Sequence, residues 1–142
     1  MQRRPAIASV LAAGVVLLAG CGQYGQYSDV DFQASVKALQ SIAAEGSLMA
    51  DDVGRGRSRT TFVRAHGQDL SDQTEHEAEK MSDAPVVPGL GRRVSAAISL
   101  ASKIGSAIDD LRVDPHDRKA AASTAHDLRA YAHQVQRLGG SG

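Results

Sequence analysis

The stretch RRVSAAISLASKIGSAIDDL, residues 92–111, decides the fold class of this chain. Its apolar side chains recur at steps of three and four residues, the spacing of one face of an α-helix. These residues are Val94, Ala97, Ala101, Ile104, Ile108 and Leu111. Most positions between them hold serine or alanine, so a neighbouring helix could approach closely. The stretch predicts an amphipathic helix, opened by Arg92, that packs inside a helical domain.

Breaking signals bound this helix on both sides. The segment DAPVVPGLG, residues 83–91, contains two prolines and two glycines and predicts a loop. In DPHD, residues 114–117, Asp114 suits a helix N-cap and Pro115 suits the first helical position. A further helix then ends near Leu138, and its seam consists of Ala121, Ala125, Leu128, Ala132 and Val135.

The sequence before these segments predicts a short first helix. Ser28 and Asp31, three residues apart, are similar to a capping box with aspartate in place of glutamate. Apolar residues then follow at steps of four, three and four residues: Phe32, Val36, Leu39 and Ala43. Glycine is common as a helix C-cap and serine as an N-cap. We therefore expect the first helix to end at Gly46 and the next to begin at Ser47.

From Ser47 to about Ser82 the spacing of three and four continues, although glycine and threonine occupy several of its positions. We expect one long helix here, kinked or broken near Gly54. A loop at residues 51–58 followed by a shorter helix is the alternative. Because no strand pattern appears, the predicted fold is all-α: an antiparallel helix bundle of three long helices plus a short N-terminal helix.

The N-terminus has the features of an export signal. Two arginines precede an apolar run, residues 6–19, that is too short to span a bilayer. The run ends in Leu18, Ala19, Gly20 and Cys21, and Cys21 is the only cysteine. This sequence resembles the lipobox of bacterial lipoproteins. The resemblance implies cleavage before Cys21, a covalent lipid on its thiol, and attachment to the extracytoplasmic face of the cell membrane.

The chain is therefore expected to divide into four parts. These are a signal peptide at 1–20, the lipidated cysteine with a flexible tether at 21–28, a bundle domain at 29–138 and a disordered tail at 139–142. The whole chain has 16 Lys and Arg against 16 Asp and Glu. Loss of the signal peptide leaves a slight acidic excess, which argues against a nucleic-acid partner.

Three histidines are candidates for a metal or haem site, because helix bundles can hold such groups between their helices. His66 follows apolar residues by one turn and is expected to be partly buried. His126 and His133 share one face of the last helix. His66 together with His126 or His133 is the predicted pairing, although no HxxxH or ExxH spacing is present and no cofactor is expected besides the lipid.

An arginine cluster is the candidate binding surface. In RGRSRTTFVR, residues 55–64, the cations are Arg55, Arg57, Arg59 and Arg64. They could bind phosphate, an anionic lipid or an acidic partner, and a solvated face is the alternative. No nucleophile motif or paired carboxylates support catalysis. The expected function is binding, as an accessory protein of the envelope, with a metal- or haem-binding bundle or a small-ligand carrier as the alternative.

Overall fold

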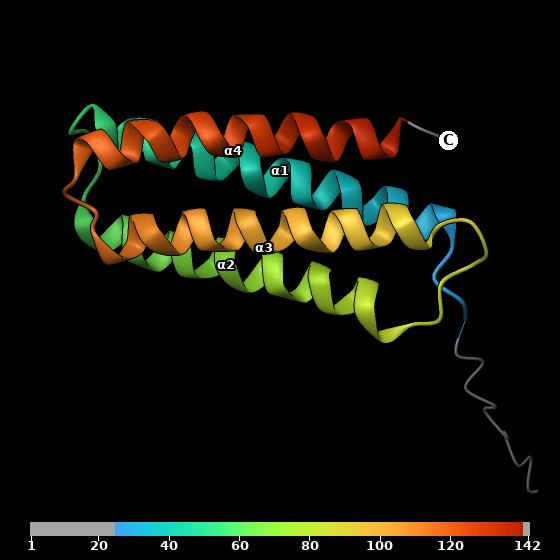
Figure 1. Cartoon of the computed structure of the whole chain (residues 1–142). Coiled ribbons are helices and arrows are strands. Elements are labelled where there is room, and N and C mark those ends of the chain that lie inside the picture. The colour runs from blue at the N-terminus through green and yellow to red at the C-terminus, as the bar shows by residue number, and fades with distance from the viewer. Residues whose placement is uncertain (1–24, 141–142) are drawn as a thin grey trace, which may run out of the picture.

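The computed structural model describes residues 25–140. Within them the chain forms four α-helices: α1 Asp29–Gly54, α2 Thr60–Asp83, α3 Gly91–Val113 and α4 Arg118–Gly139. The helices lie lengthwise beside one another and alternate in direction (Figure 1). The predicted all-α antiparallel bundle is confirmed. The predicted signal peptide, with Leu18, Ala19, Gly20 and Cys21, lies outside the described residues.

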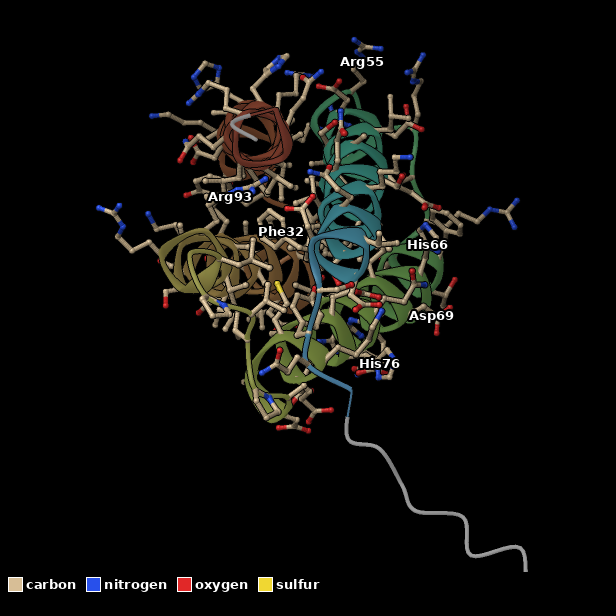
Figure 2. All side chains as sticks on the ribbon, turned by 90° about the vertical axis from the view of Figure 1, so that its right-hand side faces the viewer. Phe32, Arg55, His66, Asp69, His76 and Arg93 are labelled. Carbon is tan, nitrogen blue, oxygen red and sulfur yellow. The ribbon has the colours of Figure 1, made fainter. Side chains whose placement is uncertain are left out.

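The four helices occupy the corners of the bundle, as the view along its length shows (Figure 2). α1 packs most extensively against α4, and α2 against α3. α1 and α3 also meet across the centre, whereas within residues 25–140 α2 and α4 do not contact each other. The largest fully buried side chains come from all four helices: Phe32, Leu39, Leu70, Met81, Ile104, Ile108, Leu128, Val63 and Val135.

The expected break at Gly46 is wrong, and so is the short first helix. α1 has 26 residues and continues through Gly46, which is buried. A Cβ at this position would lie 3.2 Å from Cδ1 of Leu128 and 3.3 Å from Cγ1 of Ile108. The glycine therefore lets α1 approach α3 and α4 closely. Ser47 caps nothing, because its hydroxyl donates to the carbonyl of Ala44 at 2.7 Å.

The predicted long helix from Ser47 to Ser82 is also wrong. The alternative, a loop at residues 51–58 followed by a shorter helix, is closer to the structure. α1 ends at Gly54, and α2 begins at Thr60. Gly56 adopts φ +67°, a left-handed conformation that favours glycine, and its N–H donates to the carbonyl of Val53 at 2.8 Å. The bundle thus has helices of 26, 24, 23 and 22 residues, none of which is short.

The start of α4 lies three residues later than expected. Asp117 is its N-cap, and its carboxylate accepts hydrogen bonds from the N–H groups of Lys119 at 3.0 Å and Ala120 at 2.9 Å. Asp114 instead closes the preceding helix, since its N–H donates to the carbonyl of Asp110 at 3.2 Å. The predicted cap at Asp114 and first helical position at Pro115 are therefore wrong, because the same segment had to end α3 before it could begin α4.

The folded domain extends beyond its expected limits at both ends. Tyr27, placed in the tether from sequence, is buried, and its hydroxyl donates to Oγ of Ser35 at 2.8 Å. Its N–H donates to the carbonyl of Pro85 at 2.8 Å, which fixes the α2–α3 loop to the start of α1. Gly139, placed in the tail, belongs to α4, and its carbonyl accepts from Nε2 of Gln33 at 2.9 Å.

The capping box expected at the start of α1 is confirmed. The N–H of Asp31 donates to Oγ of Ser28 at 3.3 Å, and the N–H of Ser28 donates to the carboxylate of Asp31 at 2.9 Å. The hydroxyl of Ser28 also donates to this carboxylate at 2.6 Å. These bonds favour the ionised form and lower the pKa of the Asp31 carboxyl below its ordinary value of 3.8.

Asp31→Ala is expected to reduce stability at neutral pH and to make the acid limb of the pH–stability curve shallower. Because the folded pKa of Asp31 is depressed, its contribution is present above the unfolded pKa and is lost as the pH falls through the folded value. The stability curves of wild type and variant should therefore converge in acid. Urea unfolding over a pH series measures this, with the exposed Asp127→Ala as control. A gap that stays constant down to low pH would contradict the prediction.

Candidate functional site

The two ends of the bundle differ in what they present. The α1–α2 connection, residues 55–59, and the α3–α4 connection, residues 114–117, lie together at one end, here named the distal end (Figure 1). The start of α1, the α2–α3 loop and the end of α4 lie at the other, here named the proximal end. At 1.5 Å per residue, α1 alone separates the two ends by about 39 Å.

Three of the four predicted arginines lie at the distal end. Arg55, Arg57 and Arg59 are all exposed in the α1–α2 connection. The guanidinium of Arg57 pairs with the carboxylate of Asp52 at 2.6 Å. Arg55 and Arg59 have no ion pair or side-chain hydrogen bond to any residue of the described chain. The connection therefore presents two uncompensated cations and one that is paired on the surface.

The fourth predicted arginine lies near the same end but on another side of the bundle. Arg64 is on the side of α2 that faces α3, where it lines a surface hollow of about 520 Å³ with Asp109, Arg112 and Val113. Closeness in sequence does not produce closeness in space here, because successive residues of a helix point in different directions. The predicted cluster is therefore divided between the α1–α2 connection and the α2–α3 side of the bundle.

Two further cations that lie at the distal end were not identified from the sequence. Arg118 and Lys119 begin α4 and are exposed. The guanidinium of Arg118 lies against Gly56, where any added Cβ would overlap it. Oγ1 of Thr60 and Nε2 of His116 are 3.2 Å apart and join the start of α2 to the α3–α4 connection. No local pattern predicts this contact, because it depends on which helix ends meet.

We define the distal arginine surface as these five cations: Arg55, Arg57, Arg59, Arg118 and Lys119. The nearby carboxylate of Asp117 is engaged in capping α4, and that of Asp52 pairs with Arg57. A guanidinium stays protonated at all physiological pH values and offers a planar set of N–H donors that suits carboxylate and phosphate oxygens. The surface is therefore suited to binding anions and is not suited to proton transfer.

The candidate metal ligands are not brought together. Nε2 of His66 lies 2.9 Å from Oε1 of Glu45 on α1, and its ring stacks on Phe62 with centroids 5.1 Å apart. Figure 2 shows His66 on the α1–α2 side of the bundle. His126 and His133 are exposed on α4, which does not touch α2. Among residues 25–140, no three His, Cys, Asp or Glu side chains gather in a way that could hold a metal.

An open groove of about 360 Å³ between α2 and α3 is one hollow that bears on the ligand-carrier alternative. Its walls are largely serine, alanine and glycine. The hydroxyl of Thr74 already donates to the carbonyl of Leu70 at 2.7 Å, and that of Ser71 to Asp109 at 3.0 Å. These two hydroxyl groups therefore donate within the protein, and the other hydroxyl groups of the wall belong to Ser102 and Ser106.

Within residues 25–140 no helix combines the length and the apolar character needed to cross a bilayer. No family model matches the chain, and no curated protein or solved structure matches it either. Any function proposed for this chain therefore rests on its own residues and geometry.

Proposed function

We propose that this protein is a lipid-anchored envelope protein that acts by binding an anionic partner at the distal arginine surface. The lipobox resemblance of Leu18, Ala19, Gly20 and Cys21 supports the anchor. The observation that carries the proposal is that the start of the folded domain and the cations lie at opposite ends of the bundle. Tyr27, the first buried residue of the domain, lies at the proximal end, whereas the cations lie at the distal end.

This geometry gives the bundle a role as a spacer. Between Cys21 and Tyr27 the chain can extend by about 20 Å at most. An anchor at Cys21 therefore keeps the proximal end near the extracytoplasmic face of the membrane. The rigid helices then hold the distal arginine surface about 39 Å further out. A partner in the envelope can reach this surface without competing with lipid headgroups.

Cys21→Ala is expected to abolish lipid attachment and to leave the longer precursor in the membrane fraction, because the thiol is the acceptor of the lipid. Labelling of cells with a radioactive or clickable fatty acid measures the first effect, and the mobility of the protein on a gel measures the second. Globomycin, which blocks lipoprotein signal peptidase, should also leave an uncleaved precursor from the wild-type chain, but this precursor still carries the lipid on Cys21. Normal maturation of the Cys21→Ala chain would contradict the anchor.

A photocrosslinking residue in place of Arg55 tests the binding surface in intact cells. We expect it to form a defined adduct with an envelope protein, and the same residue in place of Arg92, exposed near the proximal end, to form none. Arg59→Glu should remove the Arg55 adduct, because it reverses a neighbouring uncompensated charge. Equal adducts from positions 55 and 92 would show that the distal end is not the interface.

A further inference from the structure

An apolar patch adjoins the distal arginine surface on the α1–α2 side of the bundle. Leu48 on α1 is 66% exposed and Phe62 on α2 is 52% exposed, although both side chains are large and apolar. The contact between Glu45 on α1 and His66 on α2 shows at which level of the bundle Leu48 and Phe62 lie. Leu48 lies one turn after Glu45 and Phe62 one turn before His66. Because α1 and α2 run in opposite directions, these steps bring Leu48 and Phe62 to the same level of the bundle.

The Phe62 ring is held in place before any partner arrives. It stacks on the ring of His66 at 5.1 Å between centroids and 23° between planes. His66 is in turn held by Glu45, with Nε2 and Oε1 2.9 Å apart. A half-exposed aromatic ring with restricted motion loses little conformational entropy on binding. Such rings are typical anchors of protein–protein interfaces.

The charged residues around this patch differ between its distal and its proximal side. Towards the distal end, Arg57 is bound to Asp52, one turn after Leu48, and Arg59 lies one turn before Phe62. Towards the proximal end the charge is negative, since Asp69 lies two turns after Phe62 on the side that also carries His66 (Figure 2). The patch therefore has arginines on its distal border, one of them paired with Asp52, and carboxylates on its proximal border.

We propose that this patch and the distal arginine surface together dock an acidic, amphipathic polypeptide segment. Its apolar side chains cover Leu48 and Phe62, while its carboxylates meet the guanidinium groups of Arg55 and Arg59. All the cations of the α1–α2 connection are arginines, and arginine suits the two oxygens of a carboxylate better than lysine does. The proposal deepens the binding role proposed above and rests on it for the partner's location in the envelope.

A discrete segment fits this surface better than a lipid bilayer does. A bilayer is laterally extended, so contact at Phe62 would also bring the carboxylates of Glu45 and Asp69 against anionic headgroups. A peptide can bind at the distal border and end before these carboxylates. The mixed charge of the α1–α2 side thus favours a polypeptide over a membrane surface.

The test measures binding of a fluorescent synthetic peptide, with the repeat Leu-Glu-Glu-Leu-Leu-Glu-Glu, to the full chain purified in detergent. Phe62→Ser and Arg59→Glu are each expected to weaken binding about tenfold, the loss typical of an interface anchor. Val30→Ser, at an apolar residue near the proximal end of α1 that is even more exposed than Phe62 (78% against 52%), and Arg92→Glu are the controls and should have no effect. Circular dichroism checks that every variant remains helical.

Several outcomes would overturn the proposal. One is equal weakening by Phe62→Ser and Val30→Ser, and another is an oligoglutamate peptide without leucine that binds as tightly as the amphipathic one. Tighter binding to vesicles of phosphatidylglycerol and phosphatidylcholine, reduced by the same variants, would assign the surface to a membrane. The assay does not need the lipid on Cys21. Failure of the peptide therefore leaves the anchor standing, and failure of fatty-acid labelling leaves the peptide result standing.

Discussion

Replacement of Arg93 by alanine is expected to lower the free energy of unfolding by about 3 kcal/mol. Arg93, on the first turn of α3, joins three helices at the proximal end (Figure 2). Its Nε and Nη2 donate to the carbonyl of Leu138 at 3.0 and 2.8 Å, close to the end of α4. Its guanidinium also lies 4.7 Å from the centroid of the Phe32 ring, which is fully buried in α1.

The loss has three unequal parts. The charged hydrogen bonds to Leu138 and the cation–π contact with Phe32 carry most of it, because the Arg93 side chain is only 20% exposed. The ion pair of Nη1 with Asp29, at 3.0 Å, contributes little because the Asp29 side chain is 61% exposed. Alanine leaves a carbonyl at the end of α4 without its donor and uncovers the Phe32 ring.

Matched variants separate these parts in urea unfolding experiments. Arg93→Lys keeps the charge but not the two-nitrogen contact with the Leu138 carbonyl, so we expect roughly half the loss. Asp29→Ala should cost less than about 0.5 kcal/mol, as expected for an exposed ion pair. Arg92→Ala, on the neighbouring exposed position, should leave stability nearly unchanged. Equal losses for Arg92→Ala and Arg93→Ala would contradict the role given to Arg93.

The second large effect is expected at Gly46, where Gly46→Val should cost about 3 kcal/mol of stability. The Cβ of any substituent already lies 3.2 Å from Leu128 and 3.3 Å from Ile108, closer than carbon atoms normally approach. The two further methyl groups of valine have no free space between these side chains, both of which are fully buried. Helices α1, α3 and α4 would have to separate to accommodate them.

Two alanine variants provide the comparison. Gly46→Ala should change stability by less than about 1 kcal/mol, because the gain in helix propensity offsets the tight contact. Gly105→Ala, where the nearest atom is Cγ2 of Thr74 at 3.7 Å, should raise stability by about 1 kcal/mol. Thermal unfolding of the three variants measures the series. A stabilising Gly46→Val would show that α1 does not run continuously against α3 and α4.

These two sites also bear on the proposed function. Arg93 fixes the end of the domain that follows the predicted tether, whereas Gly46 lets α1 continue to the distal end as one rigid element. If α1 had ended at Gly46, the arginines of residues 55–59 would have followed a second, independently oriented helix. The continuous helix fixes their distance from the start of the domain. The spacer role proposed here therefore depends on the packing of Gly46.

The sequence predicted part of the candidate site. It identified Arg55, Arg57 and Arg59 as a group, because they lie within five residues of one another and remain together wherever the segment folds. It could not predict the addition of Arg118, which depends on α4 beginning beside Gly56. It also could not separate Arg64 from the group, because that depends on which side of α2 meets α3. Side-chain direction on a helix becomes known only when its neighbours are placed.

The sequence by itself determined the all-α class, the seams of α3 and α4, the α2–α3 loop and the capping box of Ser28 and Asp31. Each of these follows from residues within a few turns of one another. The tertiary structure decided where α1 ends, because glycine can end a helix or admit a close neighbour. At Gly46 the contacts with Ile108 and Leu128 select the second use, whereas at Gly56 the positive φ angle selects the first. Packing between helices settled what local propensity left open.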